Sequence, residues 1–117
     1  MDARVGLGRS GEDLAASLYR DLGFRIVDRN CRVGRGEIDL IAVKDRLLVF
    51  CEVKTRRTNR WGEPSEAVGY AKQARLRRLA AGWMRRHRPG PVEVRFDVVS
   101  VIVGERDTWV THLPEAF

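Results

Sequence analysis

Two β-rich runs joined by a very short connection limit most strongly what this chain can fold into. Glu37–Val43 and Leu47–Thr55 alternate apolar residues with others, and only the residues KDR separate them. This pattern is typical of a β-hairpin, whose register is set by its short loop. A loop symmetric about its centre places Ile41 opposite Phe50 and keeps apolar side chains together. The sequence therefore predicts a hairpin with one buried face.

The same register brings two carboxylates together beyond the apolar pairs of the hairpin. Asp39 is expected to face Glu52, with opposed Cβ atoms ~4.5–5.5 Å apart. Carboxylates this close repel each other unless one holds a proton or a cation lies between them. Carboxylate oxygens suit Mg²⁺ or Mn²⁺, and Mg²⁺ also binds phosphate oxygens. We therefore expect Asp39 and Glu52 to ligate one divalent ion.

A lysine follows the second carboxylate at the spacing that keeps it on the same strand face. Lys54 could position a nucleophile or stabilise charge on a phosphoryl transition state, and Glu37 would face it and orient it. The set is thus a workable metal-dependent phosphodiesterase site. A second interpretation stays open, in which Glu37 and Lys54 form only a cross-strand ion pair at a solvated strand end.

Local signals along the rest of the chain predict two helices and three further strands. Ser10 begins a capping-box pattern before a helix, and Ser65 is a candidate cap for a longer one. The expected helices are Gly11–Leu22 and Ser65–Arg86, and the expected strands are Phe24–Asn30, Val92–Val103 and Thr108–Leu113. The order is helix, three strands, helix, two strands. It predicts an α/β fold with a central mixed sheet flanked by helices, in a single domain over residues 1–117.

The charge balance favours a polyanionic partner. The chain has 22 basic and 16 acidic residues, for a net charge of +6. Such an excess suits nucleic acid. No apolar run approaches the ~20 residues that a membrane span needs, and the N-terminus lacks an apolar signal segment. We therefore expect a cytoplasmic protein without a membrane partner.

Basic residues gather in the loop after the hairpin and in the second helix. No acidic residue occurs between Ala67 and Val92. The expected nucleic-acid contacts are Arg56, Arg57, Arg60, Trp61, Lys72, Arg75 and Arg78. The arginines could equally be a solvated face, and Trp61 could cover the edge of the core. Lys72 falls in the apolar stripe of its helix, so it points toward the sheet, as a site contact or as a snorkelling lysine.

The acidic residues and the lysine carry a resemblance to a known superfamily. Asp39 together with Glu52-Val53-Lys54 resembles the signature of restriction-endonuclease-like proteins, although Ile38 stands where proline often precedes the first acid. Over almost the whole chain, the motifs GEDLAASLY, GEIDLIA, EVKTR and AVGYAKQARL resemble the bacterial YraN-like family. That family is similar to archaeal Holliday-junction resolvases, which carry a further glutamate on the first helix.

The resemblance implies a restriction-endonuclease-like fold and adds Glu12 to the candidate site. Glu12 stands where the resolvases have that glutamate, so it would assist Asp39 and Glu52 as a third metal ligand. A carboxylate in the first turn also favours the helix dipole, which explains Glu12 without any site.

We therefore expect a Mg²⁺- or Mn²⁺-dependent nuclease whose substrate is DNA rather than RNA, with branched or damaged DNA as candidate substrates. The alternative is a nucleic-acid-binding module that keeps the fold and does not cut. A homodimer would suit an enzyme that cuts two strands.

Overall fold

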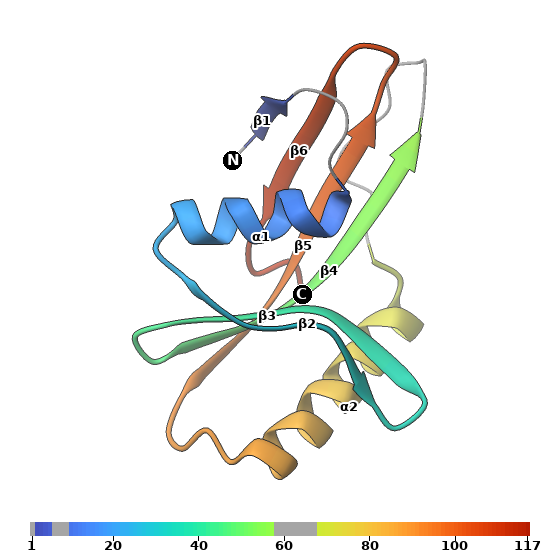
Figure 1. Ribbon diagram of the computed structural model, residues 1–117. Coiled ribbons are helices and arrows are strands. Elements are labelled where there is room, and N and C mark those ends of the chain that lie inside the picture. The colour runs from blue at the N-terminus through green and yellow to red at the C-terminus, as the bar shows by residue number, and fades with distance from the viewer. Residues whose placement is uncertain (1, 6–9, 58–67) are drawn as a thin grey trace.

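The structure is a computed structural model that describes residues 2–5, 10–57 and 68–117. Its centre is a six-stranded sheet with the strand order β1-β6-β5-β4-β3-β2 (Figure 1). The strands are β1 (Asp2–Val5), β2 (Arg25–Val33), β3 (Gly36–Lys44), β4 (Leu47–Arg57), β5 (Glu93–Val103) and β6 (Thr108–Leu113). Only β4 and β5 pair in parallel, and the other neighbours are antiparallel. The predicted mixed sheet is confirmed, with β1 as an additional edge strand paired to β6.

Two helices flank this sheet. Helix α1 (Gly11–Asp21) begins as predicted, because the Ser10 side chain accepts a hydrogen bond from the Asp13 amide at 3.1 Å. Helix α2 (Tyr70–His87) has Gly69 as its N-cap, so the predicted start at Ser65 is wrong; Ser65 itself lies outside the described residues. Within the described part of the chain, neither helix is long and apolar enough to cross a membrane.

Each helix covers one face of the sheet with its own apolar cluster. Under α1, the cluster contains Leu14, Leu40 and Cys51. Under α2, it contains Phe50, Leu76 and Trp83. Neighbouring residues of β4 therefore point to opposite faces, and both faces are buried. The expected single buried face is therefore wrong, and the double burial explains the unbroken apolar runs at residues 40–43 and 47–51.

The hairpin of β3 and β4 has the predicted register near its turn and departs from it farther away. Ile41 pairs with Phe50 as expected, but the ladder ends at Leu40 and Cys51. Strict alternation would put Ile38 on the same face as Leu40. Instead Ile38 joins the cluster under α2 while Leu40 joins the one under α1. The alternation of β3 is therefore interrupted at Asp39, between these two residues, where β3 leaves β4.

Candidate active site at the divergence of β3 and β4

Asp39 occupies the point where the two strands separate. Its Oδ2 accepts a hydrogen bond from the backbone amide of Val53 at 2.8 Å. The carboxylate thus replaces the strand carbonyl that the amide would meet if the ladder continued. The side chain is half-buried. The predicted facing of Asp39 and Glu52 in a continuous ladder is wrong, but Asp39 still reaches the residue next to Glu52.

Three further carboxylates surround Asp39 closely enough to change its titration. The pKa of Asp39 is raised to about 6, mostly by burial and in addition by the charges of Glu52, Glu12 and Glu37. The hydrogen bond from Val53 acts in the opposite direction and lowers the pKa. Glu12 and Glu52, the other two predicted metal ligands, thus lie near enough to Asp39 to act on it electrostatically. Their mutual repulsion is the electrostatic condition that a bound cation relieves.

The position of Glu12 follows from close packing at the start of α1. Gly11 rests on β4, and a Cβ at this position would collide with the Thr55 hydroxyl. The first turn of α1 is also tied to β2, because Arg29 Nη2 lies 2.7 Å from Asp13 Oδ1. These two contacts fix the first turn of α1, and Glu12 in that turn is near enough to Asp39 for its charge to raise the Asp39 pKa. Arg29 was not among the predicted site residues, because no local pattern pairs a strand arginine with the first turn of α1.

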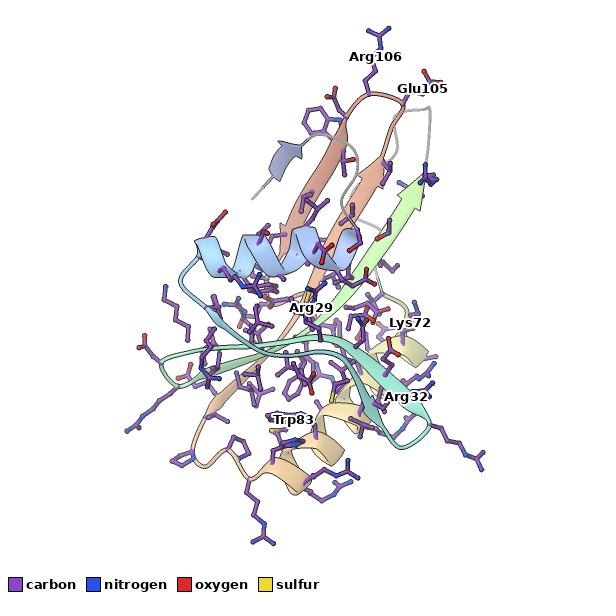
Figure 2. The ribbon with its side chains drawn as sticks, in the orientation of Figure 1. Arg29, Arg32, Lys72, Trp83, Glu105 and Arg106 are labelled. Carbon is purple, nitrogen blue, oxygen red and sulfur yellow. The ribbon has the colours of Figure 1, made fainter. Side chains whose placement is uncertain are left out.

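An open cleft of about 440 Å³ runs along the second half of β4. It is lined by Glu52, Val53, Lys54, Thr55, Arg56, Lys72 and Ser100. Lys72, in the first turn of α2 (Figure 2), reaches across so that its Nζ lies 3.3 Å from Glu52 Oε1. Lys72 therefore points toward the sheet, as its place in the apolar stripe indicated. Lys54 and Arg56 share the cleft with this ion pair.

The donor set fits a hard divalent cation without forming a closed cage. Every candidate ligand is a carboxylate, and the described residues donate no hydrogen bond to Asp39 Oδ1. Within residues 2–5, 10–57 and 68–117, no three His, Cys, Asp or Glu side chains are gathered tightly enough to hold a metal ion. Mg²⁺ in proteins commonly keeps several waters and takes one or two carboxylates plus substrate phosphates. Asp39 and Glu52 would suffice for such a site, with Glu12 beside them.

The remaining predicted residues fall into three groups. Arg57, Arg75 and Arg78 are exposed and available to a partner, but they do not line the cleft. Arg60 and Trp61 lie outside the described residues. Glu37 is cross-strand from Arg32 of β2, and the ladder ends before the predicted pair of Glu37 with Lys54.

A second polar cluster surrounds Asp97 on β5, and it is more deeply buried and richer in hydrogen-bond donors than the cluster around Asp39. Asp97 is fully buried and accepts hydrogen bonds from Tyr19 at 2.6 Å and from His112 at 2.9 Å. Arg95 donates to both carboxylate oxygens at 2.8 Å, and the Glu115 amide donates at 3.1 Å. Burial alone would raise the pKa of Asp97, but the bonds from His112, Arg95 and Tyr19 outweigh it and hold the pKa well below its usual range. Asp97 and His112 were not among the predicted site residues, and the structure makes them partners in this buried cluster.

Comparisons with known proteins place the chain among close relatives. Residues 11–101 match the model described as "Uncharacterised protein family UPF0102". The chain is 51% identical over 113 residues to a UPF0102 protein of Streptomyces griseus subsp. griseus. The aligned region covers 96% of this chain and 95% of the relative. It is 45% identical over 118 residues to a UPF0102 protein of Rhodococcus opacus, over the full length of both chains. These matches confirm the YraN-like family that the motifs indicated.

Proposed function

We propose that this chain, which belongs to the UPF0102 family, is a metal-dependent nuclease that hydrolyses phosphodiester bonds in DNA. One observation carries the proposal: Glu12, Glu37 and Glu52 approach Asp39 where β3 leaves β4, and raise its pKa. Carboxylates that repel one another destabilise a fold unless a cation or proton binds between them, and such groups cluster at functional sites. A cationic cleft directly beside them supplies the complementary charge for a phosphodiester. The sequence resemblance to restriction-endonuclease-like proteins points to the same reaction.

The chain's own residues would divide the work as follows. Asp39 and Glu52 would hold Mg²⁺ or Mn²⁺, with Glu12 assisting. The ion, when bound, supplies Lewis-acid stabilisation of charge on the phosphate. Lys54, two residues after Glu52 in the cleft, would place its ammonium against the scissile phosphate or the attacking oxygen. The Val53 amide would keep the Asp39 carboxylate oriented through its 2.8 Å hydrogen bond.

The surface around the cleft supports a nucleic-acid substrate. Arg56 and Lys72 line the cleft itself. Arg75 and Arg78 lie exposed on α2, which has no acidic residue in its first turn and three basic residues in its last. Contacts of this kind neutralise backbone phosphates and carry little base information. We therefore expect binding that depends on salt and tolerates many sequences.

The ion pair between Lys72 and Glu52 favours a second candidate function. Lys72 Nζ lies 3.3 Å from Glu52 Oε1, so a metal ion at Glu52 would compete with this lysine for the carboxylate charge. In that alternative, the chain binds nucleic acid through the same cleft and does not cut it. Lys72 would then be a permanent neutralising partner, not a phosphate contact that exchanges.

A cleavage assay separates the two functions. The full chain is incubated with linear, branched and nicked DNA and with RNA, with Mg²⁺, with Mn²⁺ or with a chelator. The nuclease proposal expects cutting that requires the metal and is lost in Asp39→Asn. The matched control is Glu105→Gln, which removes one negative charge from the β5–β6 turn, far from α2 (Figure 2). Binding without cutting under every metal condition would favour the module and contradict the nuclease.

A further inference from the structure

A second cleft lies between β2 and the last turns of α2, away from the acidic site. Its volume is about 340 Å³, and its lining residues are Asp28, Asn30, Cys31, Arg32, Val33, Gly82, Trp83, Arg86 and His87. It shares no lining residue with the cleft along β4. Neither the proposed reaction nor the predicted nucleic-acid contacts use it.

Two arginines from different elements give this cleft an excess of positive charge. Arg32 comes from β2 and Arg86 from α2, and both are exposed. Among the described residues, neither guanidinium has an ion-pair partner. One carboxylate, Asp28, also lines the cleft, and its Oδ1 accepts a hydrogen bond from the Arg29 amide at 2.8 Å. Two cations against one anion leave the cleft suited to a phosphate group, which arginine binds with its fork of N–H donors.

Close packing fixes the walls of the cleft. A Cβ at Gly82 would lie 3.0 Å from Val33 Cγ1, so the glycine lets α2 approach β2. The ring of His87 stacks on Trp83, with centroids 4.2 Å apart, and its Nδ1 lies 3.0 Å from the Trp83 carbonyl oxygen. The helix end that carries Arg86 is therefore held against the strand that carries Arg32. Arg32 and Arg86 therefore line the same cleft from two elements that are packed against each other.

We infer that this cleft, here called the Arg32–Arg86 pocket, binds a backbone phosphate of the nucleic acid that enters the acidic site. The inference rests on the proposed function, because it takes its phosphate from the same substrate. Lys72 and Arg86 are fourteen residues apart on α2, which corresponds to about 21 Å at 1.5 Å per residue. That span equals roughly six steps of a duplex at 3.4 Å each. The pocket is thus a second anchor that sets where the substrate lies relative to the carboxylates.

The inference is tested by nuclear magnetic resonance on the full chain. The amide signals of Gly82 and Asn30 report on the pocket, and that of Val53 reports on the acidic site. The probes are inorganic phosphate alone and a DNA duplex of about 20 base pairs, longer than the expected span. The test variant carries Arg32→Gln and Arg86→Gln. The control carries Arg20→Gln and Arg106→Gln, which removes two exposed charges from α1 and from the β5–β6 turn.

The duplex should move the signals of Gly82, Asn30 and Val53 together. The test variant should lower the slope of log affinity against log salt by about 0.9, because the pocket neutralises one duplex phosphate, and the control should keep the slope. Movement of Val53 alone, or equal slopes in both variants, would overturn the inference and leave the nuclease proposal standing. Pocket signals that move with inorganic phosphate and not with the duplex would assign the pocket to a small phosphate compound and overturn it too. A duplex that moves no signal and is not cut contradicts both proposals.

Discussion

Asp39 and Asp97 are carboxylates on the same sheet with opposite environments. Asp97 lies within β5, flanked by β4 and β6 and covered by α1, and three side chains and one amide donate to it. Asp39 lies where β3 leaves β4 and has one amide donor and three carboxylate neighbours. The pKa is therefore held low at Asp97 and raised to about 6 at Asp39.

The charge of Asp97 stabilises the fold, whereas the charge of Asp39 does not. At Asp97, every donor comes from an element that must be in place, so the carboxylate joins α1, β5, β6 and the C-terminal residues. At Asp39, the neighbours raise the free energy of the ionised form, and only an added cation or proton lowers it. The first arrangement suits a structural role and the second suits binding.

The largest expected effect separates the two aspartates by stability. Asp97→Asn removes a buried charge from Arg95 and His112, and such a loss typically costs about 3–5 kcal/mol of unfolding free energy. Asp39→Asn removes repulsion and should leave the unfolding free energy unchanged or slightly higher at pH 7. Urea denaturation of both variants measures this. A similar loss of unfolding free energy in both variants would show that Asp39 is a structural residue like Asp97.

The second largest expected effect distinguishes Lys54, in the cleft near Asp39, from Arg95, which binds Asp97. Lys54→Ala should slow single-turnover cleavage about 10²–10³-fold, as the loss of one transition-state donor does elsewhere, with metal and DNA binding largely kept. Arg95→Ala should instead lower stability, because Asp97 loses its bidentate partner. If Lys54→Ala cut DNA at the wild-type rate, Lys54 would have no part in the chemistry.

The pH dependence of stability should have opposite signs for the two carboxylates. An unfolded Asp titrates near 4. The raised pKa of Asp39 contributes stability that is full below about pH 4 and is lost as the pH rises through about 6. The lowered pKa of Asp97 contributes stability that is full above about pH 4 and is lost as the pH falls further.

Denaturation from pH 3 to pH 7 measures both contributions. The advantage of the wild type over Asp39→Asn should shrink by about 1–2 kcal/mol between pH 4 and pH 7, after allowance for solvent screening. The Asp39→Asn chain should still lose stability below pH 4, since Asp97 remains. A constant difference between the two chains across the range would show that the Asp39 pKa is not raised.

The smallest effect concerns the exposed ion pair beside the acidic site. The Lys72 side chain is 57% exposed, and exposed ion pairs contribute ~0–1 kcal/mol. Lys72→Ala should therefore lower the unfolding free energy by at most about 1 kcal/mol. It should also release Glu52 and strengthen Mn²⁺ binding a few-fold. Calorimetric titration measures the affinity, and the control is Lys44→Ala, which removes a lysine at the end of β3 that does not line the cleft. Weaker Mn²⁺ binding in Lys72→Ala alone would mean that the lysine helps to form the metal site.

Most of the fold could be predicted because its signals are local. Ser10 is the N-cap of α1, as its sequence pattern indicated. The β3–β4 turn has Asp45 at a φ of 54°, a left-handed conformation that short hairpin loops require. The start of α2 could not be predicted, because Gly69 caps it without any side-chain bond and Ser65 offered a stronger local signal. Strand β1 was missed because its pairing with β6 joins opposite ends of the chain.

The candidate site was predictable in its residues but not in its geometry. The spacing of Asp39, Glu52 and Lys54 followed from strand alternation, and Glu12 followed only from the family resemblance. The end of the ladder at Leu40 depends on packing against both helices, which no local pattern encodes. The role of His112 likewise depends on the pairing of β6 beside β5.

The pKa of the Asp39 carboxyl, with and without Mg²⁺, tests the central claim most directly. It can be followed by carbon-13 resonance of the aspartate side chains, with Asp39→Asn to assign the signal. We predict a pKa of about 6 in the absence of metal and a value below about 4, the unperturbed range, when Mg²⁺ is saturating. A pKa of about 6 that does not move at saturating Mg²⁺, or an unperturbed pKa without metal, would contradict the account.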